Sequence, residues 1–159
     1  MNIITATQEN AEWIAEIVSK SNKDVAEQFN ITKENNSKHP SFYTKDWVRS
    51  DFNRGEEYFI YKENNINKGC VAFEQPDERT AYLNRLCVLP KYRHNGIGES
   101  LVNHILEYSK SKNIKVVSIG IIAAHEVLKV WYSRLGFIEG ATQKFDHLPF
   151  DVTYMQYEL

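Results

Sequence analysis

The fold of this chain is decided by the stretch Leu83-Asn-Arg-Leu-Cys-Val-Leu-Pro-Lys-Tyr-Arg-His-Asn-Gly-Ile-Gly-Glu-Ser-Leu-Val102. An apolar strand pattern runs to Pro90, and a basic turn containing Gly96 and Gly98 follows it. An amphipathic helix starts directly after the turn. A strand, a turn of bare backbone and a helix N-terminus together favour an anion, because the turn N–H groups and the helix dipole both attract negative charge. The stretch therefore predicts a phosphate-binding turn.

The turn lacks the signatures of the commonest nucleotide sites. The dinucleotide fingerprint Gly-x-Gly-x-x-Gly is incomplete because its last position is Leu101, and no Gly-Lys-Ser/Thr sequence is present. A Gly-x-Gly pair alone also occurs in tight strand-to-helix connections that bind nothing. We therefore expect a phosphorylated ligand that does not use the usual NAD or ATP motifs.

Length and composition indicate a single domain, residues 1–159, with its own core. The chain has 42% hydrophobic and 25% charged residues and a formal net charge of −2, which gives no reason to expect nucleic acid as a partner. No apolar run approaches a membrane span, and no signal peptide is visible. Cys70 and Cys87 fall in predicted strands and indicate buried thiols in a reducing compartment. We expect a cytoplasmic protein without membrane association.

Hydrophobic periodicity predicts an α/β fold with the element order βααβββαβαββ. Strands are expected at residues 3–6, 57–62, 67–74, 80–89, 115–122, 137–144 and 150–158. Helices are expected after Thr7 and at residues 41–52, 98–113 and 126–135, with residues 21–40 forming a loop or a weak helix. The apolar run at 115–122 is typical of a central parallel strand. Together these elements predict a mixed sheet with helices on both faces.

A second segment, His125-Glu-Val-Leu-Lys-Val-Trp-Tyr-Ser-Arg-Leu-Gly-Phe137, predicts a helix on which His125 and Tyr132 project from the same side. Considered alone, a helical tyrosine is usually a packed ring with a satisfied hydroxyl. With the turn, however, it resembles the GCN5-related N-acetyltransferases. Arg93-His-Asn-Gly-Ile-Gly98 is similar to that family's Arg/Gln-x-x-Gly-x-Gly/Ala signature, and Tyr132-Ser-Arg-Leu-Gly-Phe137 to its Tyr-x-Lys/Arg-Leu-Gly-Phe segment.

This resemblance covers roughly Glu57 to the C-terminus, and the N-terminal elements more loosely. It implies the family's mixed, mostly antiparallel sheet of six to seven strands, and acetyl-CoA as the acetyl donor. In the family, backbone amides of the turn bind the pyrophosphate, and the preceding strand pairs with the pantetheine arm in a gap where the sheet splays open. The matching positions here are Leu86, Cys87 and Val88 on the strand and Arg93, His94, Asn95, Gly96, Ile97, Gly98 and Glu99 at the turn.

Two further positions are implied by the resemblance, each beside a plain alternative. His125 stands where the family commonly has an asparagine that contacts the cofactor arm, and simple surface exposure is the alternative. Arg134 stands where many members carry a basic residue near the adenosine 3′-phosphate, and a solvated helix charge is the alternative.

The resemblance also assigns Tyr132 as the general acid for the departing thiolate. A free tyrosine has a pKa near 10, so this hydroxyl is protonated at neutral pH. The family fixes no position for the base that deprotonates the amine. Glu74, at the end of the third strand, is our first candidate, followed by His147 and Asp146 in the loop before the last strand. For each of the three, a surface or turn residue without a role is the alternative. We expect no metal, because the histidines show no ligand spacing.

We therefore expect an N-acetyltransferase that moves an acetyl group from acetyl-CoA to a primary amine by direct attack in a ternary complex. The alternative is a non-catalytic acyl-CoA-binding or regulatory module of the same fold. Cys87 is not expected to carry the acyl group, because a strand position does not favour a thiolate. Small amines, amino acids, polyamines and protein N-termini all stay open as acceptors, and so does a homodimer through the terminal strands. The aromatic residues that either line an acceptor pocket or belong to the core are Phe42, Tyr43, Trp47 and Phe52.

Overall fold

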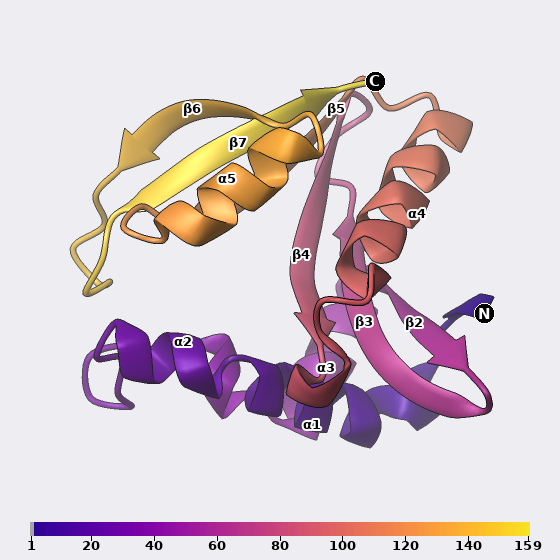
Figure 1. Ribbon diagram of the computed structural model, residues 1–159, viewed down its shortest axis with the longest axis horizontal. Coiled ribbons are helices and arrows are strands. Elements are labelled where there is room, and N and C mark those ends of the chain that lie inside the picture. The colour runs from indigo at the N-terminus through magenta and orange to yellow at the C-terminus, as the bar shows by residue number, and fades with distance from the viewer. Residues whose placement is uncertain (1) are drawn as a thin grey trace.

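The computed structural model describes residues 2–159 and shows the expected α/β fold (Figure 1). Within these residues a seven-stranded sheet has the order β1-β2-β3-β4-β5-β7-β6. The strands are β1 (Asn2–Thr5), β2 (Glu57–Glu63), β3 (Ile66–Glu74), β4 (Thr80–Val88), β5 (Val116–Ile122), β6 (Ile138–Gln143) and β7 (Val152–Glu158). The helices are α1 (Ala11–Ser21), α2 (Lys23–Gln28), α3 (Lys45–Asn53), α4 (Ile97–Ser111) and α5 (Glu126–Arg134).

Helices cover both faces of the sheet, because successive strand residues point to opposite sides. On β2, Tyr58 and Ile60 enter a core built with α1 and α3, whereas Phe59 and Tyr61 enter a second core built with α4. The second core also takes Tyr132 of α5. Both cores are apolar, so each helix is held to the sheet by the apolar stripe that the sequence predicts.

The sheet opens between β4 and β5. These two strands run parallel and pair only from Thr80 to Tyr82, whereas β5 continues to pair with β7 as far as Ile122. Arg85 has a φ of 46°, and the β3–β4 register shifts between Cys70 and Ala72, as at a β-bulge, which bends a strand. Figure 1 shows β4 running away from the layer of α5, β6 and β7. The gap expected beside this strand is therefore present.

Two elements differ from the sequence prediction. Residues 21–40 contain the short helix α2, which places one helix more before the central strands than expected. The sequence signal for this helix was weak because Ala26 is its one buried residue, and a single buried position gives no apolar periodicity. β5 is parallel to β4 over three residue pairs and antiparallel to β7 along its length, so it is a parallel strand only at its start.

Candidate functional site

The turn before α4 leaves a row of backbone donors without protein partners. Gly96 has a φ of 78°, and no atom lies within 4 Å of the position that a Cβ would take. The N–H of Ser100 donates to the Gly96 carbonyl, at 3.0 Å. In contrast, no N–H from His94 to Glu99 donates a hydrogen bond to any residue of the 2–159 range. Such orphan donors at a helix N-terminus suit an anion.

These donors border a cavity of about 710 Å³, here called the strand–turn cavity, between the end of β4, the turn, α2 and α5. Ten of the residues expected to bind the donor line it: Leu86, Cys87, Val88, Arg93, His94, Gly96, Ile97, Gly98, Glu99 and His125. The other lining residues were not predicted from the sequence. They are Ser21, Asn22, Asp24, Val25, Gln28, Tyr92, Val127, Leu128 and Trp131. The walls from α1 and α2 carry no local motif, so only the tertiary structure reveals them.

Gly98 is favoured by packing rather than by backbone conformation. A Cβ at this position would lie 3.3 Å from Cζ2 of Trp131 and 3.9 Å from a methyl of Val88. The absent side chain therefore lets α5 approach the turn closely, and Trp131 closes one side of the strand–turn cavity.

Arg93 lies at the cavity but its charge is already paired. Its Nη1 donates to Asp24 Oδ2 at 2.7 Å, and its Nη2 donates to the Ser21 carbonyl at 2.8 Å. Burial would raise the pKa of Asp24, but the hydrogen bond and charge of Arg93 outweigh it and hold that pKa below its usual value. Arg93 thus fastens the turn to the α1–α2 junction. Asn95 lies outside the cavity lining and donates to the carbonyls of Tyr92 and Arg93.

His125 precedes α5 as its N-cap. It lines the strand–turn cavity, whereas Tyr132 does not. The Nδ1 of His125 accepts the Leu128 N–H at 3.4 Å, and its ring centroid lies 5.4 Å from that of Phe29. Burial lowers the pKa of His125, in agreement with a neutral ring whose Nδ1 accepts a hydrogen bond. The capping role explains why a hydrogen-bonding residue occupies this position.

Tyr132 is buried and lines neither cavity of the site. Its ring packs against Trp131 and Phe137, with centroids 4.9 and 5.3 Å apart. Burial, with a smaller contribution from the neighbouring Cys87, raises the pKa of the Tyr132 hydroxyl, which therefore stays protonated. Arg134 is exposed at the end of α5 and also lines neither cavity.

A second cavity of about 620 Å³, here called the splay cavity, lies where β4 and β5 separate. Every residue that lines it is uncharged. The lining comprises Thr80, Tyr82, Asn84, Ser118, Ile119, Gly120, Val152, Tyr154 and Gln156.

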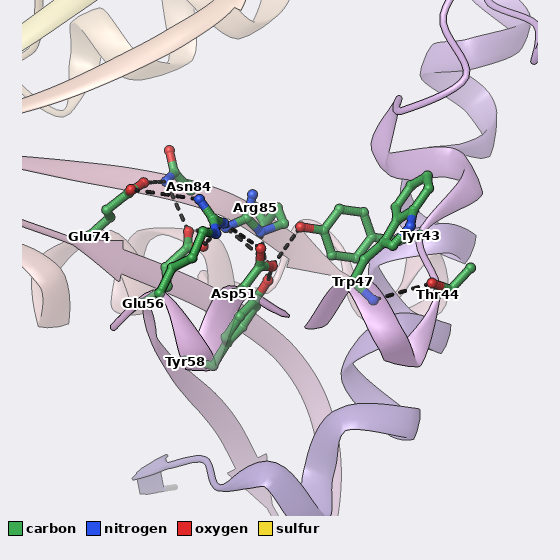
Figure 2. Close-up of polar contacts among 10 residues, drawn as sticks. Tyr43, Thr44, Trp47, Asp51, Glu56, Tyr58, Glu74, Asn84 and Arg85 are labelled. Atoms are coloured by element: carbon green, nitrogen blue, oxygen red, sulfur yellow. Dashed lines mark hydrogen bonds and ion pairs between the residues drawn. The ribbon is translucent and has the colours of Figure 1, made fainter. Parts of the chain in front are cut away.

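A cluster of charged and phenolic side chains lies beside Asn84, as Figure 2 shows. Asp51 and Glu56 are 4% and 2% exposed, and Arg85 forms ion pairs with both. The hydroxyls of Tyr43 and Tyr58 donate to Asp51 Oδ2 at 2.5 and 2.7 Å. Burial is the main cause that raises the pKa of Tyr43 to about 12. The cluster joins α3, β2 and β4 into one rigid wall.

Glu74, the first candidate base, lies at the edge of this cluster and is not in the lining of the splay cavity. Its Oε2 accepts a hydrogen bond from Asn84 Nδ2 at 3.1 Å, and its Oε1 lies 4.0 Å from Arg54 Nη1. Its side chain is 35% exposed, so it is the most accessible carboxylate of the cluster. The next candidates, Asp146 and His147, are exposed in the β6–β7 loop and line neither cavity.

The aromatic residues proposed for an acceptor pocket belong to the packing around α3. Phe52 contacts Tyr58, with centroids 5.4 Å apart, and Trp47 meets Tyr43 edge-on at the same distance. None of Phe42, Tyr43, Trp47 and Phe52 lines a cavity of the site. The cluster of Asp51, Glu56 and Arg85 was also not predicted from the sequence. The sequence signal for this cluster is weak, because it consists of the cation Arg85 within a largely apolar strand.

Within residues 2–159, no helix is both long and apolar enough to cross a membrane. No three histidine, cysteine or acidic side chains in the same range are grouped so that they could hold a metal ion.

Solved structures with this fold include two acetyltransferases. One is the ribosomal-protein-S18-alanine N-acetyltransferase from Escherichia coli, with a TM-score of 0.79 and 14% identity over 99% of this chain and 92% of that chain. The other is a putative acetyltransferase from Salmonella typhimurium with its cofactor acetyl-CoA, with a TM-score of 0.73 and 20% identity over 100% of this chain and 94% of that chain. At these identities the likeness shows the fold.

Sequence comparison places the chain in a family. An uncharacterized N-acetyltransferase from Methanocaldococcus jannaschii is 28% identical over 106 residues, which are 60% of this chain and 47% of that protein. The matched part therefore spans about half the length of that relative. The model of the acetyltransferase (GNAT) family matches residues 22–137, which include β4, the turn, α4 and α5. The chain belongs to the acetyltransferase (GNAT) family.

Proposed function

We propose that this protein is an N-acetyltransferase that transfers an acetyl group from acetyl-CoA to a primary amine within a ternary complex. The observation that carries the proposal is the row of unpartnered N–H groups from His94 to Glu99, at the head of α4 and beside the open edge of β4. Membership of the GNAT family and the acetyl-CoA-containing structural relative support it.

The strand–turn cavity fits acetyl-CoA in two parts. The unpartnered turn amides would bind the pyrophosphate, and each hydrogen bond to a charged oxygen contributes roughly 1.5–3 kcal/mol. Beyond Tyr82, no strand of residues 2–159 pairs with β4 on the β5 side, so Leu86, Cys87 and Val88 would pair with the pantetheine amides. His125 would close the cavity from α5. Arg134 is exposed on the surface, so the adenosine 3′-phosphate is the only part of acetyl-CoA that could reach it.

The two cavities lie along one strand, which suits direct transfer. Leu86, Cys87 and Val88 line the strand–turn cavity, while Tyr82 and Asn84 of the same strand line the splay cavity. The donor would enter from the first cavity and the amine from the second. The reacting groups would then meet beside β4, with no acyl-enzyme required.

Bound acetyl-CoA supplies a thioester whose carbonyl carbon is the electrophile. During transfer, a nitrogen–carbon bond forms, the carbon–sulfur bond breaks, and the sulfur leaves as a thiolate. Tyr132, held protonated by burial near Cys87, would donate its proton to that sulfur. Glu74, the most exposed carboxylate of the cluster behind Asn84, would accept the proton that the amine loses.

Release of CoA thiol from acetyl-CoA, followed with a thiol reagent across a panel of primary amines, tests the function. We expect amine-dependent thiol release in equal amount to acetylated amine, measured by mass spectrometry. CoA binding without thiol release for any amine would contradict catalysis and favour a non-catalytic acyl-CoA-binding module.

A further inference from the structure

Asn84 has a side-chain amide whose orientation is fixed from one side only. Its Nδ2 donates to Glu56 Oε1 at 3.0 Å and to Glu74 Oε2 at 3.1 Å, which uses both amide hydrogens. Figure 2 shows its amide oxygen pointing away from these two carboxylates. From residues 2–159, Oδ1 receives no side-chain hydrogen bond. Since Asn84 lines the splay cavity, this oxygen is a free acceptor at its wall.

The cluster behind Asn84 carries an excess of negative charge. It contains three carboxylates, Asp51, Glu56 and Glu74, and two guanidinium groups, Arg54 and Arg85, so one negative charge is not compensated. Glu74 is the least well paired of the three, because its closest guanidinium nitrogen is 4.0 Å away. The potential at this end of the cavity therefore favours a hydrogen-bond donor or a cation and opposes an anion.

The rest of the cavity wall offers nothing to compensate an anion. The lining contains no lysine, arginine or histidine, and its largest side chains, Tyr82 and Tyr154, provide aromatic surface. A carboxylate brought into such a cavity would lose its water without gaining a charged partner, which is costly. The volume of about 620 Å³ is suitable for a small molecule or one terminal residue of a peptide.

We propose that Asn84 binds the acceptor amine through Oδ1, and that the splay cavity selects primary amines whose adjacent carbon carries an uncharged group. The favoured substrates are then α-amino amides, rather than free α-amino acids. This inference rests on the proposed acetyltransferase function and specifies its acceptor. Glu56 and Glu74 have the positioning role, since they bind both amide hydrogens of Asn84 and leave the oxygen of this lining residue as the free group.

Matched substrate pairs test the selection on the unaltered protein. L-alanine is compared with L-alaninamide, and L-phenylalanine with L-phenylalaninamide, by thiol release from acetyl-CoA. Each kcat/KM is divided by the neutral fraction of that amine, because the two members of a pair differ in amine pKa. We expect the amides to be favoured by at least about tenfold, which corresponds to 1.4 kcal/mol. A ratio near one, or a preference for the free acids, would overturn the inference.

Replacement of Asn84 tests the contact itself. In Asn84→Ala we expect the KM for the amide substrates to rise about tenfold, while the KM for acetyl-CoA is unchanged. The control is Gln143→Ala, which removes an exposed amide side chain from β6 and should change neither constant. A second variant, Gln156→Arg, places a cation at the cavity lining and should reduce the preference for amides.

The outcomes separate the two proposals. Absence of thiol release with every amine would overturn both the acetyltransferase function and its acceptor class. If Asn84→Ala turns over the amine substrates with an unchanged KM for the amine, the acetyltransferase function stands and the role of Asn84 is overturned. Since the substrate pairs need no variant, the inference stays testable even where Asn84→Ala does not fold.

Discussion

At the residue scale, the hydroxyl of Tyr132 is the group on which the proposed proton donation depends. Tyr132→Phe keeps the ring that packs against Trp131 and Phe137 but removes the donor. We expect kcat to fall by about 10²–10⁴-fold, the usual range for general-acid catalysis, with an unchanged calorimetric Kd for acetyl-CoA. Tyr157→Phe, in the same core, is the control and should keep its turnover. Normal turnover by Tyr132→Phe would remove the general-acid assignment.

The proposed role of Glu74 as the base should be visible in the pH dependence of kcat/KM. Glu74→Gln keeps an oxygen for Asn84 but cannot take up a proton at neutral pH. We expect kcat/KM to fall by about 10²-fold at pH 7 and to recover as pH rises above the pKa of the amine, about 8 for an α-amino group, because the amine is then already neutral. Glu78→Gln, an exposed turn carboxylate, is the matched control. A pH profile for Glu74→Gln that runs parallel to that of the unaltered protein would exclude Glu74 as the base.

At the element scale, the start of α4 depends on a glycine that is needed for its backbone conformation. Gly96 and Gly55 both have positive φ, 78° and 93°, and both have open space where a Cβ would lie. Alanine at either position should therefore lower the free energy of unfolding by a similar amount, about 1–2 kcal/mol. Urea unfolding measures this loss.

The two glycine variants should differ in donor binding. Gly96→Ala also shifts the unpartnered amides of the turn, so we expect its Kd for acetyl-CoA to increase at least about tenfold, as lost charge-assisted hydrogen bonds imply. Gly55→Ala lies away from both cavities and should bind acetyl-CoA normally. Equal affinity in the two variants would contradict the assignment of the turn to the phosphates.

At the scale of the whole molecule, three histidines make stability dependent on pH. Burial lowers the pKa of His39, His104 and His125, and the Nε2 of His104 is buried without a partner in residues 2–159. In the unfolded chain each has the ordinary pKa near 6.5, so below that pH the unfolded state binds more protons than the folded state.

The free energy of unfolding should therefore be constant above about pH 6.5 with respect to these groups and should decrease as pH falls toward 5. Urea unfolding at four pH values between 5 and 8 measures the trend. His125→Asn retains a capping side chain and should have a shallower decrease. A free energy of unfolding that does not change, or that rises on acidification, would show that these histidines keep ordinary pKa values.

Patterns local in the sequence predicted a large part of the fold and many of the residues that line the strand–turn cavity. The β4–turn–α4 segment contains its own strand, its own left-handed glycine and its own apolar helix face, so neighbouring residues determine it. Ten residues that were predicted to bind acetyl-CoA line the strand–turn cavity. They lie in this segment and at the N-cap of α5. The short helix α2 lies in the segment expected to be a loop or a weak helix, and its bounds were not predicted because so short a helix has little periodicity to detect.

The sequence by itself determined the type and order of most elements, the glycine-containing turn before α4 and the family. These features depend on residues within one or two turns of each other, where spacing alone specifies geometry. Only the tertiary structure decided that Arg93 is neutralised by Asp24 and that Asn84 is oriented by Glu56 and Glu74. Those contacts join residues that lie 10 to 69 positions apart, so their partners depend on how the elements pack, which no local pattern encodes.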